Sequence, residues 1–249
     1  MLRRSRVIAS VAAIVLLASC SSQSSKGQVT LHVLAASSLT EAFTAIGQRF
    51  HREHSSVRVA FEFAGSSALV RQLHEGAPAD VLATADNSTM HQAVVAGDAA
   101  APRVFAHNRL EIVVSRGNPK EVAGLADFGR LRVVALAAPS VPAGRYAAEA
   151  FARAGLSVPA ASQEPDVRAV LTKVELGEAD AGVVYVTDAL AAGDRVTRVA
   201  IPSEHNVVAS YLVATARRSR QGSEAAAFVA AVRSPSGQRA LGRFGFTGV

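Results

Sequence analysis

The sequence predicts an α/β protein of two lobes that close on each other like a clamshell, each lobe built on a mixed, mainly parallel sheet flanked by helices. From residue 29 onwards, short apolar runs alternate with segments of helical periodicity. The order strand, helix, strand, helix, strand occurs twice, over residues 29–85 and again over residues 131–186. That order is typical of parallel strands with helices on both faces. Two further strands, 109–115 and 207–215, are interpreted as crossings between the lobes.

The first lobe is predicted from apolar periodicity. Residues 29–36 are mostly apolar, as expected of a strand that is covered on both faces. The elements that follow are a helix with the stripe Leu39, Phe43, Ile46 and Phe50, an alternating strand over 57–63, a helix through Leu69, Val70 and Leu73 that ends at Gly76, and a short strand over 79–85.

The second lobe repeats this scheme. It starts with a strand over 131–137, and a helix that opens at 141–144 stops at Gly155. Asp166 is expected to cap a helix that runs to Leu176, with Gly177 past its end and a strand over 181–186 after it. Two C-terminal helices, with Ser223 and Ser236 as expected caps, would pack back onto the first lobe. We therefore assign residues 29–108 plus 212–249 to lobe I, and residues 109–211 to lobe II.

The N-terminus has the features of an export signal. Arg3, Arg4 and Arg6 precede an apolar run over residues 7–17, which is shorter than the roughly 20 residues that a membrane span needs. Residues 1–19 are thus predicted to be a signal peptide. The segment Leu-Ala-Ser-Cys that ends at Cys20 resembles a lipobox, and Cys20 is the only cysteine of the chain. We expect a lipid on Cys20, a polar tether over 20–28 and an extracytoplasmic domain held at the bacterial cell membrane.

The charge of the chain argues against nucleic acid as a partner. The formal net charge is +6, but three of the positive charges belong to the predicted signal peptide. The other Lys and Arg side chains are scattered along the sequence, so we interpret them as a solvated surface.

Candidate binding groups lie where predicted strands lead into predicted helices. A helix N-terminus offers free N–H groups and a partial positive charge, which together bind anions without a charged side chain. Four such loops occur, at residues 35–41, 63–67, 141–144 and 165–167, and Tyr185 ends a strand nearby. In the first loop, Ser38 and Glu41 have the spacing of a capping box. Their convergence on one cleft does not follow from spacing alone.

Each of these residues also has a purely structural interpretation. A serine at a helix start is most often an N-cap, although a hydroxyl can accept one hydrogen bond and donate another. Tyr185 could be an ordinary core tyrosine. Arg145 and Arg168 follow two of the loops closely, and we interpret both as surface charges rather than as part of a binding site.

Several blocks of the sequence resemble the molybdate-binding receptors of ABC importers. These blocks are AASSLTEAF, FEFAGSSALVRQLHEGAPADVLATAD, VPAGRYAAEAF, DVRAVL, GVVYVTDA and RFGFT, in the same order as in that family. The resemblance implies a two-lobed periplasmic-binding-protein fold of type II, molybdate or tungstate as ligand, and an ABC permease as partner. It implies a monomer that needs no cofactor, is not an enzyme and has no site for a bare metal ion.

The resemblance also implies which residues hold the oxyanion. Carried over block by block, the ligand-binding positions of the family fall on Ser38, Ser66, Ala143, Val167 and Tyr185. Hydroxyl groups would donate from the two serines and the tyrosine, and backbone N–H groups from the alanine and the valine. Because the serine loops differ from those of other members, Ser37 and Ser67 are the alternatives at each loop.

A site made only of donors suits molybdate, which carries no proton at neutral pH. Phosphate keeps a proton and needs an acceptor, whereas sulfate would be excluded only by its smaller size. Molybdate and tungstate are too similar in size for the sequence to separate them.

Three other functions fit the sequence less well. A ferric-ion receptor would need tyrosine, histidine or carboxylate ligands, and the chain has only three tyrosines. A serine hydrolase would need a nucleophile elbow, but the motif G-x-S-x-G is absent from the sequence. His51 and His54 have a spacing that could bind a metal, but we interpret them as part of an exposed helix face. A ligand-sensing regulator would not need an export signal.

Overall fold

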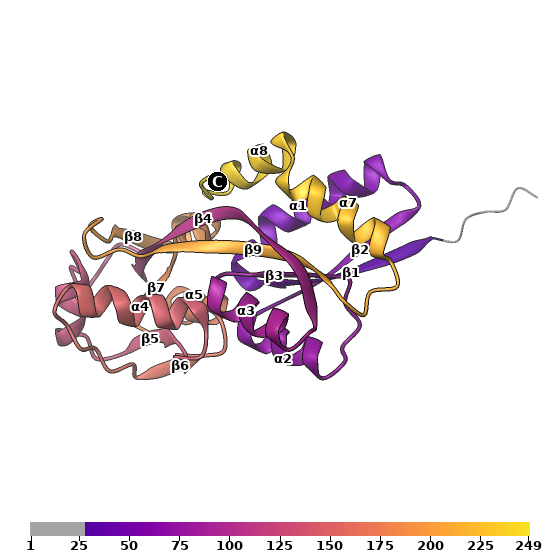
Figure 1. Cartoon of the computed structure of the whole chain (residues 1–249). Helices are drawn as coiled ribbons and strands as arrows, with labels where there is room; N and C mark the ends of the chain where they lie inside the picture. The colour runs from indigo at the N-terminus through magenta and orange to yellow at the C-terminus, as the bar shows by residue number, and fades with distance from the viewer. Residues whose placement is uncertain (1–27) are drawn as a thin grey trace, which may run out of the picture.

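The computed structural model describes residues 28–249 and has two α/β lobes joined by two long strands (Figure 1). The predicted signal peptide, Cys20 and almost all of the predicted tether lie outside the described residues. Within residues 28–249, no helix combines the length and the apolar character that crossing a membrane would need.

Lobe I contains three parallel strands in the order β2-β1-β3, and each is followed by a helical segment on the way to the next strand. In chain order these elements are β1 (Val29–Ala36), the 3-10 turn η1 (Ser37–Leu39), α1 (Thr40–Glu53), β2 (Val57–Ala64), α2 (Ser66–His74), β3 (Val81–Thr84) and α3 (Asn87–Val95).

Lobe II repeats this arrangement with strand order β7-β5-β6. Its elements are η2 (Leu125–Arg130), β5 (Val134–Ala137), α4 (Pro142–Arg153), β6 (Ser162–Glu164), α5 (Val167–Glu175), β7 (Ala181–Tyr185), α6 (Val186–Ala192), η3 (Gly193–Arg195) and β8 (Val196–Ala200).

Two antiparallel strands cross between the lobes, β4 (Ala99–Ser115) and β9 (Val208–Ala216). β9 also pairs with β3 of lobe I, while β4 also pairs with β7 and β8 of lobe II. The sheets of both lobes are therefore continuous through this pair. The predicted lobe boundaries, after residues 108 and 211, fall inside these two strands.

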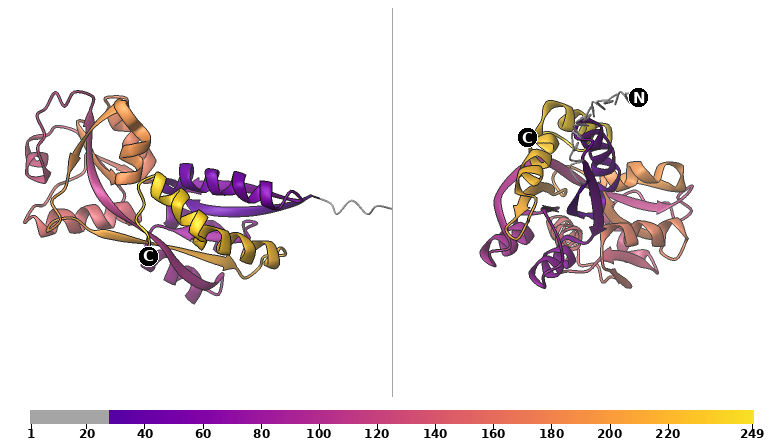
Figure 2. Two further views of the ribbon diagram at one scale, coloured as in Figure 1. Left: turned by 90° about the horizontal axis from the view of Figure 1, so that it is seen from above. Right: turned by 90° about the vertical axis from the view of Figure 1, so that its right-hand side faces the viewer.

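The last two helices, α7 (Gly222–Arg233) and α8 (Pro235–Arg243), return to lobe I and pack beside α1 (Figure 2). Phe228 of α7 meets Phe43 and Phe50 of α1 edge-on, at ring-centroid distances of 6.0 and 5.4 Å. These aromatic contacts join the C-terminus of the chain to the first helix, as the sequence predicted.

Several local predictions are confirmed. Asp166 caps α5 by accepting hydrogen bonds from the backbone N–H groups of Arg168 and Ala169, and Pro142 is the first residue of α4. Gly76 and Gly177 follow their helices with φ of 94° and 72°, a region that favours glycine.

Other local predictions are wrong. Ser234, not Ser236, caps α8, and no side chain caps α7, so Ser223 is not a cap. The strand expected over 131–137 begins at Val134, and the strand expected over 109–115 begins already at Ala99. α3, β6, α6 and β8 were not predicted from the sequence, and the strand expected over 181–186 ends at Tyr185.

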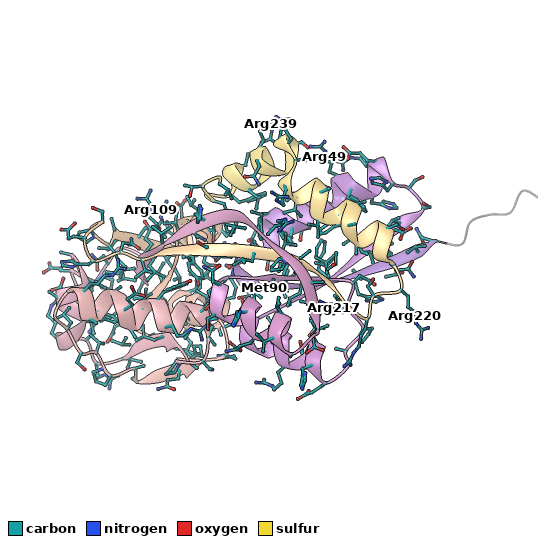
Figure 3. All side chains as sticks on the ribbon, viewed as in Figure 1. Arg49, Met90, Arg109, Arg217, Arg220 and Arg239 are labelled. Atoms are coloured by element: carbon teal, nitrogen blue, oxygen red, sulfur yellow. The ribbon has the colours of Figure 1, made fainter. Side chains whose placement is uncertain are left out.

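Basic side chains are scattered over the surface. Figure 3 shows Arg109 on a crossing strand, Arg239 on α8, and Arg217 and Arg220 at the opposite end of the molecule. This distribution agrees with the sequence-based interpretation of a solvated surface.

Gly144 is expected to be essential for the fold of lobe II. A Cβ at this position in α4 would lie 2.2 Å from the carbonyl oxygen of Ala138 and 2.4 Å from that of Ala137. Because backbone cannot move aside as a side chain does, Gly144→Ala should lower the free energy of unfolding by about 1–3 kcal/mol. Chemical denaturation measures this loss. Gly129→Ala is the matched control, since a Cβ there meets nothing within 4 Å. If Gly144→Ala proved as stable as Gly129→Ala, the prediction would be contradicted.

Candidate ligand-binding site

The candidate site is a small cavity between the lobes, at the carboxyl ends of the parallel strands of both. Its volume is about 10 Å³, close to the room that one water molecule requires. So small a space favours a small ligand over a sugar or a peptide. The lining residues are Ala36, Ser37, Ser38, Ala64, Gly65, Ser66, Ala85, Val141, Pro142, Ala143, Val167 and Tyr185.

The structure brings together all five residues that the sequence analysis selected. Ser38 lies in η1, Ser66 is the first residue of α2, Ala143 is the second of α4, Val167 is the first of α5, and Tyr185 ends β7. All five are buried and line the same cavity. Their convergence, which residue spacing could not establish, is thus present in the structure, while their role in binding stays a prediction.

The two alternative serines lie in different places. Ser37 lines the cavity beside Ser38, but Ser67 does not line it. Instead, the Ser67 hydroxyl donates a hydrogen bond of 2.5 Å to the carbonyl oxygen of Ser140 in the other lobe. At the second loop the geometry therefore favours Ser66 over Ser67.

The hydroxyl of Ser66 keeps its proton available for a ligand in the cavity. Its Oγ accepts a hydrogen bond of 3.0 Å from the backbone N–H of Ala85. A backbone N–H can only donate, so the proton of the Ser66 hydroxyl is free for another acceptor.

Tyr185 presents a hydroxyl group that has no partner among the described residues. The side chain is 1% exposed, and its hydroxyl is a buried polar group without a hydrogen bond in residues 28–249. Burial raises the pKa of Tyr185 well above its ordinary value, so the phenol keeps its proton at neutral pH. Because orphaned buried polar groups are rare in proteins, this hydroxyl indicates a ligand position.

Backbone donors complete the site. The first N–H groups of a helix have no partner within that helix, and Ala143 and Val167 both lie in first turns. Asp166 accepts from Arg168 and Ala169 but not from Val167. Among residues 28–249, no charged side chain lines the cavity. The site therefore combines neutral donors with the positive ends of helix dipoles, as anion sites do.

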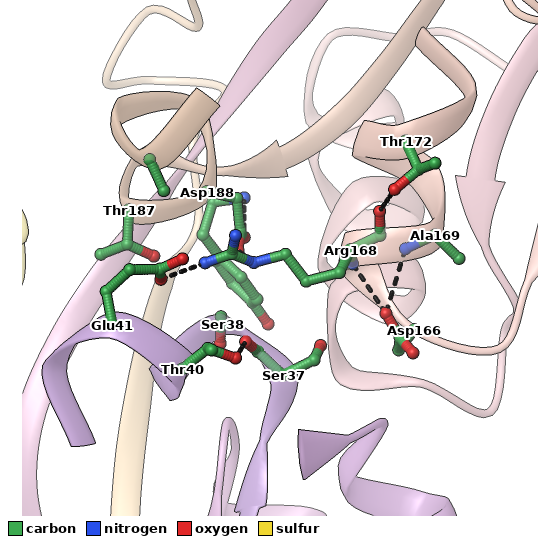
Figure 4. Close-up of polar contacts among 12 residues, drawn as sticks. Ser37, Ser38, Thr40, Glu41, Asp166, Arg168, Ala169, Thr172, Thr187 and Asp188 are labelled. Carbon is green, nitrogen blue, oxygen red and sulfur yellow. Dashed lines mark hydrogen bonds and ion pairs between the residues drawn. The ribbon is translucent and has the colours of Figure 1, made fainter. Parts of the chain in front are cut away.

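The interpretation of Arg145 and Arg168 as surface charges is wrong, because both form ion pairs from lobe II to lobe I. Arg145 pairs with Asp86, whose side chain is 4% exposed, and also donates to the Thr89 hydroxyl at 3.0 Å. Arg168 pairs with Glu41 at the start of α1 (Figure 4). Each arginine follows a helix start that faces the cleft, so its long side chain reaches the opposite lobe.

The capping box expected for Ser38 and Glu41 is absent, because both side chains have partners far along the chain. η1 precedes α1, and no side chain caps either element. The Glu41 carboxylate is directed to Arg168, and the Ser38 hydroxyl contacts Tyr211 at 2.8 Å. Both side chains thus make contacts far along the chain instead of closing a local cap.

Asp188 is a buried residue near the site that the sequence analysis missed. Its side chain is fully buried, forms an ion pair of 2.7 Å with Arg168 Nε and accepts from the backbone N–H of Tyr185 at 3.2 Å. Burial raises the pKa of Asp188 to about 6, and the neighbouring Arg168 lowers it less. Its position three residues after Tyr185, at the start of α6, is a capping-box spacing that could have identified it.

The two lobes are closed on each other in this structure. Besides the two ion pairs and the Ser67 contact, Gly65 of lobe I lies so near lobe II that a Cβ would be 2.4 Å from the carbonyl oxygen of Pro165. Glycine allows this close approach of the two backbones.

Comparisons with known proteins agree with this geometry. Residues 31–247 match the family described as bacterial extracellular solute-binding protein. The chain belongs to this family. It is 42% identical over 224 residues to the molybdate-binding protein ModA of Mycobacterium tuberculosis, covering 89% of this chain and 85% of the relative.

Two further matches extend this solute-binding family assignment. A putative ABC transporter substrate-binding lipoprotein, YvgL of Bacillus subtilis, is 30% identical, with 96% of each chain covered. The solved periplasmic molybdate-binding protein of Azotobacter vinelandii superposes with a TM-score of 0.76 over 87% of this chain and 98% of that one, at 16% identity. The last comparison concerns the fold, and it confirms the predicted two-lobed architecture.

The ion pair between Glu41 and Arg168 should stabilise the closed form of this solute-binding protein. The side chains are 34% and 23% exposed, so we expect Glu41→Gln to weaken ligand binding by about 1 kcal/mol, or about fivefold. Calorimetric titration measures the affinity. Glu53→Gln is the control, because it removes an ion pair with Arg49 that lies within one helix of lobe I. Unchanged affinity in Glu41→Gln would show that the pair does not contribute to closure.

Proposed function

We propose that this chain captures molybdate or tungstate outside the cytoplasm and delivers it to the permease of an ABC importer. The observation that carries this proposal is the small cavity lined by neutral donors, which Tyr185 helps to line and where its buried hydroxyl has no hydrogen-bond partner among residues 28–249. A relative also supports the proposal, since the mycobacterial protein that is 42% identical to this chain is a molybdate-binding protein.

The donor set supports a tetrahedral oxyanion without protons. The hydroxyl groups of Ser38, Ser66 and Tyr185, with the N–H groups of Ala143 and Val167, offer protons to oxygen atoms that only accept. No carboxylate of residues 28–249 lines the cavity, so the strong acceptor that best holds the proton of phosphate is missing there. Burial of that proton without an acceptor would cost about 1–3 kcal/mol, which disfavours phosphate.

The division of the site between lobes supports a role in transport. Ser38 and Ser66 belong to lobe I, whereas Ala143, Val167 and Tyr185 belong to lobe II. Separation of the lobes would therefore remove about half of the hydrogen bonds at once and release the anion without any chemical step.

The proposal includes anchoring through a lipid on Cys20. The lipobox-like segment before Cys20 supports it, as does the description of the Bacillus subtilis relative as a lipoprotein. A lipid at this position would keep the receptor at the membrane, beside the permease that it supplies. Mass spectrometry of the protein from membranes tests this part, and an unmodified Cys20 would contradict it.

Titration by calorimetry tests the choice of ligand. Purified residues 28–249 should bind molybdate and tungstate, bind sulfate more weakly, and show no heat with phosphate. Absence of binding to molybdate, or equal affinity for sulfate, would overturn the proposal.

The choice of serines is tested by single substitutions. Ser38→Ala and Ser66→Ala should each weaken molybdate binding by about 1–3 kcal/mol, the usual effect of one lost hydrogen bond to a charged group. Ser223→Ala is the control, because this exposed hydroxyl contacts only Glu224. If both site variants bind as tightly as the wild type, other groups hold the anion.

A further inference from the structure

The hydrogen bond of the Ser38 hydroxyl can run in either direction, whereas that of Ser66 is fixed by a backbone N–H. Its Oγ lies 2.8 Å from the hydroxyl oxygen of Tyr211, and either group can be the donor. Both side chains are buried, at 2% and 0% exposure. The direction matters, because a serine that donates to Tyr211 would have no proton for an anion.

The surroundings of Tyr211 settle which group donates. Within residues 28–249, its hydroxyl has two hydrogen-bond partners, Ser38 Oγ and Asn108 Nδ2, the second at 3.5 Å. An amide NH2 only donates, so Ser38 Oγ is the one acceptor for the phenol proton. A buried hydroxyl nearly always donates its proton, and Tyr211 therefore donates to Ser38.

Asn108 is oriented by a group that cannot reverse its role. The backbone N–H of Arg109 donates to Asn108 Oδ1 at 2.9 Å, which directs Nδ2 to the Thr187 hydroxyl at 2.9 Å and toward Tyr211. The order of donors therefore runs from the backbone through Asn108 and Tyr211 to Ser38.

Rigid packing holds Tyr211 in this position. Its ring meets those of Tyr185, Phe105 and Phe246 at centroid distances of 5.7, 6.3 and 5.1 Å. Burial also raises the pKa of Tyr211 well above its ordinary value, so its phenol stays protonated and remains a donor at neutral pH.

We propose that Tyr211, oriented by Asn108, is a positioning residue that keeps the proton of Ser38 free for donation to the ligand. The Tyr211 proton occupies a lone pair of Ser38 Oγ, as the Ala85 N–H does for Ser66. Ser38 therefore does not donate its own proton to Tyr211 and can donate it to an anion oxygen. This inference rests on the proposed function, because it specifies how the same site holds the oxyanion.

The first test is the substitution Tyr211→Phe, which keeps the ring and removes the phenol proton. Ser38 would then lose the hydrogen bond that fixes the direction of its own proton. We expect molybdate affinity to fall about fivefold, the effect of one lost neutral hydrogen bond.

A double-mutant cycle shows whether Tyr211 acts through Ser38. Once Ser38→Ala has removed the serine hydroxyl, adding Tyr211→Phe should change molybdate affinity by less than about twofold. Tyr146→Phe is the matched control, since no hydrogen bond of its hydroxyl occurs in residues 28–249, and it should leave molybdate affinity unchanged.

The outcomes separate the two proposals. Additive losses in the cycle, or an unchanged molybdate affinity in Tyr211→Phe, would overturn the role of Tyr211 while wild-type binding of molybdate still supports the proposed function. A wild-type protein that does not bind molybdate would overturn the proposed function itself. Thermal unfolding of Tyr211→Phe without ligand shows whether the variant is folded. Asn108→Ala, which leaves the phenol in place, provides the second variant and should lower molybdate affinity as well.

Discussion

An anion that is removed from water needs a hydrogen-bond donor for each of its oxygen atoms, and most features of this cleft follow from that requirement. The chain supplies donors where α2, α4 and α5 begin, because the first N–H groups of a helix are free. Parallel strands direct their carboxyl ends, and hence these helix starts, to one edge of each sheet. β4 and β9 connect the two lobes so that the two edges face each other.

The charged residues around the cavity serve closure rather than contact with the ligand. Arg168 is balanced by Glu41 and Asp188, and Arg145 is balanced by Asp86, so neither guanidinium is left to attract an anion alone. The same pairs join the lobes. A partly buried arginine that lost its carboxylate partner would be costly, which explains why each cation near the cavity has an acid beside it.

Local signals made much of this arrangement predictable. Periodicity located the strand and helix repeats, and Asp166, Pro142 and the glycines after the helices marked correct helix ends. The selection of Ser38, Ser66, Ala143, Val167 and Tyr185 depended on family resemblance, and the structure places these residues around one cavity.

Contacts between distant residues could not be predicted in this way. Tyr211 lies 173 residues from Ser38, and Glu41 lies 127 residues from Arg168, so no spacing rule connects them. The errors on Arg145 and Arg168 have this origin, because an arginine after a helix start looks the same in sequence whether it faces water or another lobe.

Anion binding in such a cleft depends on proton direction as much as on charge. A serine hydroxyl has one proton, and it cannot give that proton to a ligand while it donates to a protein acceptor. Ser66 faces a backbone N–H, and Ser38 faces a Tyr211 hydroxyl that donates, so both serines keep their protons for the cavity. Groups behind the cavity, which do not line it, thus decide what the groups that line it can donate.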